Sequence, residues 1–299
     1  GETTWPAGTF LVAAGDVTHA RVEETARALG LRISALGSTP SVDTAPLSRP
    51  RVGLYHAWGG NMDEGWTRWV LEQFEFDYAQ LHDAEIRAGD LAEAYDVIVL
   101  PDASYSSMLR GLSADRMPAE YAGGMTIRGA ASLYDFVVEG GTLVAMDSAS
   151  ELPLEIFDLP IRDVTSGQSD DDFFIPGTLL RLDVDPEHPL GYGMPEETTA
   201  FFSRSPAFAL GRPLGRRERM VGATPEPDPA VTAVATYPDD DLLKSGWLLG
   251  DRVIEGRAAV VEAEVEAGRV VLLGFRVQHR GQPHGTFKLL FNAIYRGGM

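Results

Sequence analysis

Cysteine is absent from this chain of 299 residues. A disulfide scaffold, a metal site built from thiolates and a cysteine nucleophile are therefore all excluded. Long apolar runs are missing too: stretches such as 97–100 and 270–273 have strand length, far short of the roughly 20 residues that span a membrane. The sequence thus predicts no membrane span. Neither a Walker motif nor a G-x-G-x-x-G motif occurs, so nucleotide binding has no support.

Positive charge is scarce, because 25 lysines and arginines face 44 aspartates and glutamates and the net charge is −19. Nucleic-acid binding needs a basic face, so no nucleic-acid partner is expected. Two acidic runs, 170–172 and 239–241, lack the spacing of a calcium loop, and we interpret them as solvated loops. What the chain does contain, 44% hydrophobic and 23% charged residues, is typical of a globular protein.

Strand-like and helix-like patterns alternate in the first half of the chain. The apolar run 97–100 (VIVL) is typical of a parallel strand covered on both faces. Trp66 and Trp69 lie three apart on a predicted helix, a spacing more common in a core than in a ligand platform. The alternation predicts an α/β fold with a flavodoxin-like, doubly wound parallel sheet. Strands are expected at 51–56, 78–81, 94–101 and 142–146, and helices at 62–74 and 127–138.

The rest of the chain is expected to flank this sheet. Residues 1–45 suggest a small β-α-β segment, with strands at 9–14 and 31–36 around a helix at 17–29, and the proline-containing stretch 38–50 suggests a linker. Residues 50–299 then form one domain with a β-rich insertion at about 163–255. An antiparallel pair at 257–263 and 268–275 and a helix at 286–295 close it, and 222–229 is a proline-rich loop or arm. Because Gly1 is no natural start, we interpret the chain as a fragment of a longer protein.

Candidate site residues follow the predicted strands. In doubly wound sheets, ligands bind outside the carboxyl ends of the strands. Polar and aromatic side chains that follow those ends are therefore expected to converge on one crevice. They are His56, Trp58, Asn61, Asp102, Ser104, Asp147, Ser148, Arg276, Gln278 and His279.

One interpretation of this set is a hydrolase in which Ser148 pairs with His279, with Asp102 or Glu151 as the carboxylate. The elbow motif G-x-S-x-G is absent, because the local string is MDSAS. The sequence favours the alternative that Asp147 or Ser148 caps the following helix.

The remaining histidines have simpler structural interpretations. His82 and Glu85 have the H-x-x-E spacing of a zinc pair, but a third ligand is not evident, and Asp83 stands where a helix cap is expected. His188 lies in a proline-bounded turn and is expected at the surface. His284 is interpreted as a loop residue. No metal site is predicted in this chain.

The stretch VEGG at 138–141, followed by the predicted strand 142–146, resembles the class I glutamine amidotransferase-like fold. That family has its nucleophilic cysteine on the turn after this strand, where this chain has Asp147 and Ser148. Its histidine-plus-glutamate element follows the last strand. Here the string 274–280 (GFRVQHR) has His279 but no paired glutamate. The resemblance therefore implies a degenerate amidotransferase-like domain.

A second resemblance covers more of the chain. The strings 62–69 (MDEGWTRW) and 279–293 (HRGQPHGTFKLLFNA) look like the C-terminal region of large bacterial proteins whose N-terminal part is a zinc carboxypeptidase of the carboxypeptidase A type. The early string 5–10 (WPAGTF) resembles the segment after the peptidase domain. The resemblance implies an upstream peptidase domain as partner, zinc bound in that domain and no cofactor here, and an extracytoplasmic (periplasmic or secreted) location.

Three functions follow from these patterns. The favoured one is a non-catalytic accessory domain of a carboxypeptidase-like protein. The first alternative is an independent hydrolase that uses Ser148 or Asp147 with His279. The second is a module that binds a peptide or small molecule in a crevice of mixed aromatic and charged groups. That crevice would be lined by His56, Trp58, Asp102, Arg276, Gln278 and His279.

Overall fold

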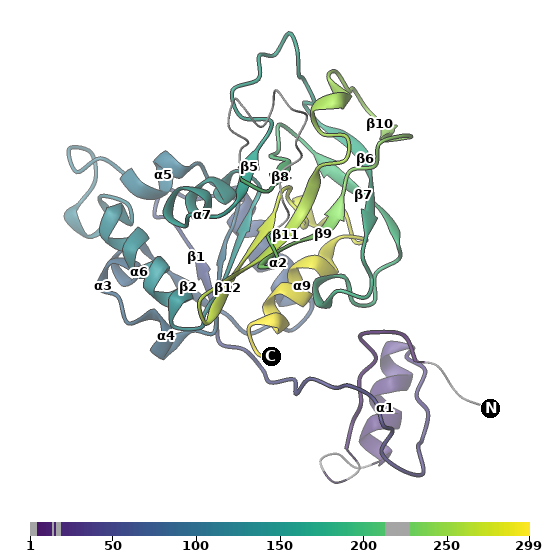
Figure 1. Ribbon diagram of the computed structural model, residues 1–299. Coiled ribbons are helices and arrows are strands. Elements are labelled where there is room, and N and C mark those ends of the chain that lie inside the picture. Colours follow the sequence, from purple (N-terminus) through teal and green to yellow (C-terminus); the bar gives the residue numbers. More distant parts are fainter. Residues whose placement is uncertain (1–4, 14, 16–18, 213–227) are drawn as a thin grey trace.

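The structure, a computed structural model, describes residues 5–13, 15, 19–212 and 228–299. A mixed sheet of twelve strands runs through the described chain (Figure 1). Five neighbouring strands are parallel, in the order β2-β1-β3-β4-β12, which is the 2-1-3-4-5 order of flavodoxin-like sheets. The expected fold class is therefore confirmed. These strands are β1 Val52–Tyr55, β2 Ala79–Leu81, β3 Val97–Leu100, β4 Thr142–Met146 and β12 Gly268–Leu273.

Beyond β12 the sheet continues with antiparallel strands. β11 pairs with β12 through the turn after Val265, as expected, then β9 pairs with β11 and β6 with β9. The strands expected within the β-rich insertion thus extend the main sheet. The added strands are β5 Ile161–Asp163, β6 Thr178–Val184, β7 Glu197–Phe202, β8 Phe208–Leu210, β9 Val231–Thr236, β10 Leu243–Ser245 and β11 Ala258–Val265. Most of the stretch 222–229 lies outside the described residues.

Helices cover both faces of the parallel strands (Figure 1). In β3, Val97 and Val99 join the core that includes side chains of α2 and α9, whereas Ile98 and Leu100 join the core under α3 and α6. Successive side chains of a strand point to opposite faces, so a fully apolar strand needs both layers. The α-helices here are α2 Met62–Gln73, α3 Asp83–Ala88, α4 Leu91–Ala94, α5 Tyr105–Arg110, α6 Thr126–Val138, α7 Glu151–Ile156 and α9 Phe287–Arg296. The short 3-10 helices are η1 Ala119–Tyr121, η2 Asp147–Ser150, η3 Pro189–Gly191, η4 Asp251–Val253 and η5 His279–Gly281.

The first segment differs from the expectation. Helix α1 His19–Leu29 forms, but residues 9–13 and 31–36 are irregular, so the predicted β-α-β unit is wrong for the described residues. Two strands alone are marginally stable in water, and among the described residues no strand pairs with either stretch. In the described part of the chain, no helix is long and apolar enough to cross a membrane.

Candidate functional site

The turn after β4 holds Asp147 in a left-handed backbone conformation, with φ +50°. Such a φ is uncommon for a residue other than glycine and is associated with sharp, functional turns. The Asp147 side chain is only 2% exposed and accepts hydrogen bonds from the hydroxyls of Ser205 (2.7 Å) and Ser148 (3.3 Å). Neither Asp147 nor Ser148 makes a side-chain cap to the helix, so the capping interpretation was wrong.

Arg276 gathers three carboxylates at the carboxyl ends of the parallel strands. Its Nε lies 3.4 Å from Asp147 Oδ2, and its Nη1 lies 3.7 Å from Asp63 Oδ2 and 3.8 Å from Asp102 Oδ2. The other Asp102 oxygen accepts a hydrogen bond from the backbone N–H of Ser148 at 3.2 Å. Asp102, Asp147 and Arg276 therefore converge as the sequence predicts. The four charged side chains are largely buried against one another.

Burial shapes the protonation of this cluster. It raises the pKa of Asp147 to about 7, and the neighbouring charge of Asp102 adds to the effect against the opposing influence of Ser205 and Arg276. Burial also raises the pKa of Asp63, partly offset by Arg276. Near neutral pH, Asp147 therefore exchanges between its neutral and ionised forms.

The predicted hydrolase pair does not form in this structure. Ser148 is exposed and its hydroxyl donates to Asp147, and no hydrogen bond joins Ser148 to His279 in the described chain. The His279 ring instead stacks on Phe201, with centroids 4.0 Å apart. Burial, with help from Arg276 and Arg280, lowers the pKa of His279 to about 4. A base of that pKa is poorly matched to chemistry near neutral pH.

Gln278 is fully buried and acts as a bridge between segments. Its amide nitrogen donates to Thr67 Oγ1 (3.0 Å) and to the backbone carbonyl of Asp63 (3.3 Å). It ties the loop after β12 to helix α2, whereas its Oε1 is buried without a hydrogen-bond partner. Gln278 thus holds Asp63 beside Arg276.

His56 and Trp58 enter a second cluster, separate from Arg276. His56 Nδ1 lies 2.9 Å from Oε1 of the buried Glu64, and Arg68 Nε lies 2.9 Å from the same oxygen. Trp58 stacks on His82, with ring centroids 3.9 Å apart and an interplanar angle of 2°. The expected single crevice is therefore divided into a closed ionic cluster and an aromatic cluster.

The other histidines have structural roles. His82, not Asp83, is the N-cap of α3, and its backbone N–H donates to Glu85 Oε2 at 2.8 Å, so the H-x-x-E spacing is a capping box. His188 is not at the surface as predicted: it caps η3 and its Nε2 lies 3.6 Å from the buried Glu262. His284 is exposed, as expected for a loop, and stacks on Phe287. Across the described residues, no group of three ligands could hold a metal ion.

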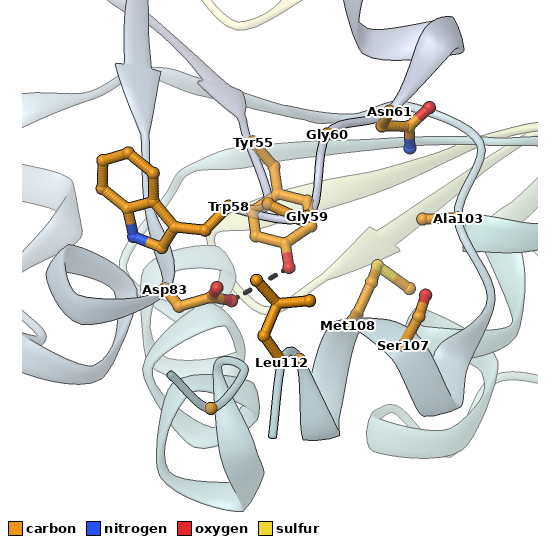
Figure 2. A pocket seen from close by; sticks show the side chains of 13 residues that line it. Tyr55, Trp58, Gly59, Gly60, Asn61, Asp83, Ala103, Ser107, Met108 and Leu112 are labelled. Atoms are coloured by element: carbon orange, nitrogen blue, oxygen red, sulfur yellow. Dashed lines mark hydrogen bonds between the residues drawn. The ribbon is translucent and has the colours of Figure 1, made fainter. Parts of the chain in front are cut away.

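A cavity of about 140 Å³ lies next to the aromatic cluster, at the carboxyl ends of β1 and β3 (Figure 2). At one wall the Tyr55 hydroxyl donates to the buried Asp83 carboxylate at 2.9 Å. Helix α5 forms another wall. Ala57, Trp58, Gly59, Gly60, Asn61, Ala103, Ser107, Met108, Gly111, Leu112 and Gly123 complete the lining.

Sequence reasoning missed several members of these clusters. Glu64 and Thr67 are three apart on α2 and share its buried face with Val70 and Leu71. That spacing is visible in the sequence and marks polar groups that face the interior. Trp69, in contrast, is 42% exposed, so its expected core position is wrong. Ser205 comes from the β-rich segment, and no local signal connects it to Asp147.

Comparisons with known proteins give distant likenesses only. No protein-family model and no curated protein matches the chain. A solved structure described as a ThuA-like protein from Bacteroides uniformis is 12% identical, covers 85% of this chain and 94% of its own, and gives a TM-score of 0.42. One described as a GMP synthase subunit from Thermoplasma acidophilum is 9% identical over 83% of this chain and 94% of its own, with a TM-score of 0.48. PurLQS from Thermotoga maritima is 17% identical, covers 83% of this chain and 98% of its own, and gives a TM-score of 0.44.

Likenesses this weak say nothing about activity. The flavodoxin-like fold of the chain stands on its own strand order. The resemblance to the C-terminal region of zinc carboxypeptidase proteins is not tested by these comparisons and stays a prediction.

Proposed function

We propose that the chain is a non-catalytic accessory domain that supports a neighbouring domain of the same protein. The observation that carries the proposal is the residue on the turn after β4. Asp147 stands where an amidotransferase-like domain has its nucleophile, yet its side chain is buried and held by Arg276 and Ser205. A nucleophile must be exposed to substrate and activated by a base. Asp147 meets neither condition and serves to join β4, β12 and the β-rich segment.

A neighbouring domain also suits the surface of the chain. The first segment leaves Phe10, Leu29 and Leu31 mostly exposed, and Met62 and Trp69 are exposed on the outer face of α2. Exposed apolar side chains that gather on one element are typical of surfaces that bind another protein. From the sequence resemblance, we propose that the neighbour is an upstream zinc carboxypeptidase domain. Zinc would then be bound in that domain, and the protein would be extracytoplasmic.

The catalytic alternative is tested by direct assay. Purified protein is incubated with glutamine, with an activated ester and with short peptides, and ammonia or product release is measured beside Ser148→Ala and His279→Gln. We expect no turnover above the rate without protein. Turnover that either substitution abolishes would show a hydrolase and reject the accessory role.

The accessory role is tested with the neighbour. The gene upstream of Gly1 is read first, for a signal peptide and a peptidase domain with an H-x-x-E pair and a later histidine. The encoded domain is then mixed with this chain, and hydrogen exchange is compared with and without it. We expect new protection in residues 19–36 and on α2. An open reading frame that begins just before Gly1, or unchanged exchange, would contradict the proposal.

A further inference from the structure

The cavity beside Tyr55 and Asp83 is not explained by an accessory role. Its volume of about 140 Å³ is close to the ~150 Å³ of an engineered apolar cavity that binds benzene. It is therefore large enough for a ligand of five or six non-hydrogen atoms. Its walls are mostly apolar, with Met108 and Leu112 facing Tyr55 across the space (Figure 2).

The charge that lines the cavity is negative. Among its lining residues Asp83 alone is charged. Asp83 is buried, accepts one side-chain hydrogen bond, from Tyr55, and forms no ion pair within the described residues. Arg87, one turn further along α3, donates to the carbonyl of Gly124 instead. Burial raises the pKa of Asp83 more than Tyr55, Arg87 and His82 lower it. A cation in the cavity would stabilise this ionised carboxylate.

The polar side chains of Asn61 and Ser107, which also line the cavity, already have partners. The Asn61 carbonyl accepts from the backbone N–H groups of Asp63 and Glu64, and its amide donates to Asp102 O. The Ser107 hydroxyl donates to Ser104 O at 2.8 Å. A ligand with many donors or acceptors would thus find few free partners on these walls, and an unpaired polar group is costly. A primary ammonium, with three N–H donors, is disfavoured for this reason.

An aromatic side chain favours a cation without N–H groups. Tyr55 lines the cavity, and aromatic rings attract cations through their negative faces. The Trp58 indole is turned away from Met108 and Leu112 in Figure 2, and His82 covers one of its faces. The Tyr55 ring is held by its hydrogen bond to Asp83, and a ring held in place binds without an added cost of ordering. A methylated ammonium can contact a ring, methyl groups and a carboxylate at once and needs no hydrogen bond.

We propose that the cavity between β1, β3 and α5 binds a small quaternary ammonium ion, with Asp83 as its counter-charge and Tyr55 as its aromatic contact. This site is independent of the Arg276 cluster and of the accessory role. The net charge of −19 favours the approach of such a cation from solution.

The probe is tetramethylammonium, and the neutral comparison is tert-butanol, which has nearly the same size. Binding is followed by NMR titration with saturation transfer to the probe's methyl groups, at constant ionic strength. We expect saturable binding of tetramethylammonium and at least about tenfold weaker binding of tert-butanol. No saturable binding, or equal binding of the two probes, would overturn the proposal.

Three substitutions separate binding in the cavity from general attraction of a cation to an acidic protein. Asp83→Asn keeps an acceptor for Tyr55 and removes the charge, and it should weaken tetramethylammonium binding at least about tenfold. The control Asp90→Asn removes the same charge from an exposed position at the start of α4 and should leave binding unchanged. Leu112→Phe fills the cavity, keeps Asp83 and should also abolish binding. If Asp83→Asn and Asp90→Asn behave alike, the cavity is not the site.

Discussion

The first segment and the sheet domain bury their apolar side chains to very different extents. Leu29 on α1 is 67% exposed, whereas Leu272 on β12 is fully buried in the core that includes side chains of α6. In the described part of residues 1–49, Ala26 is the one buried residue. A helix or strand is stable when its apolar face packs on a second layer, and the sheet domain supplies both layers itself. The first segment has the apolar residues without the second layer, which fits a surface that another domain covers.

The largest expected effect comes from removing the same side chain in each region. Leu272→Ala should lower the free energy of unfolding by about 2–5 kcal/mol, because it leaves a cavity in the core. Leu29→Ala, in the first segment, should cause no measurable change. Urea denaturation of both variants checks this. Comparable losses would mean that α1 packs on the sheet more closely than its exposure indicates.

The second comparison sets a buried ionic cluster against an exposed ion pair. Arg276→Met leaves Asp63, Asp102 and Asp147 without their cation and should cost about 2 kcal/mol, somewhat less than a fully buried pair. Arg49→Met breaks the pair with Asp77, in which both side chains are exposed, and should have no measurable effect. Denaturation at neutral pH distinguishes the two. A loss for Arg276→Met that is no greater at pH 8 than at pH 5 would argue against carboxylate repulsion.

The third test concerns pH. The Asp147 pKa of about 7 lies above its unfolded value, so the folded state binds more protons between about pH 4 and 7, and stability falls as pH rises through that window. Asp147→Asn should remove this decrease, so the variant gains about 2–3 kcal/mol relative to the wild type between pH 5 and pH 8. If the free energies of unfolding of the two proteins differ by the same amount at pH 5 and at pH 8, the pKa of about 7 for Asp147 is contradicted.

His279, in the same region of the molecule, changes stability with pH in the opposite direction. Its folded pKa of about 4 lies below the unfolded value, so stability falls as pH decreases from about 6.5 to 4. His279→Gln should flatten the acid side of the profile while Asp147→Asn flattens the neutral side. Measuring both variants separates contributions that partly cancel in the wild type.

The parallel sheet and the meeting of Asp102, Asp147 and Arg276 could be predicted because they follow from strand patterns and from the edge at which parallel strands end. The state of that cluster could not. The left-handed φ of Asp147 and its bond to Ser205 depend on segments 58 residues apart in the chain. The spacing of Trp66 and Trp69 predicts a core position, yet the face of α2 that carries Glu64 is the buried one and Trp69 is 42% exposed.

The same dependence on distant segments explains why the strands predicted in the first segment do not form. Residues 31–36 have strand-like composition, but a strand forms by pairing, and no strand lies beside them in the described chain. Local pattern predicted α1 correctly because a helix makes its hydrogen bonds within itself. The cavity had no sequence signal, since it arises where β1, β3 and α5 leave space between them.

The smallest expected effect is that of deleting the first segment, and it is the sharpest test of the comparison between that segment and the sheet domain. Deleting residues 1–47 keeps Ser48, whose hydroxyl donates to the carbonyl of Gly298, and removes none of the sheet's core, which begins at Val52. The shortened chain should therefore unfold at the same temperature as the full chain. A clear fall in the midpoint would show that the first segment stabilises the sheet. If the midpoint is unchanged but the shortened chain no longer alters hydrogen exchange in a neighbouring domain, then the exposed leucines of the first segment belong to that interface, and the sheet domain is the part of the chain that stands by itself.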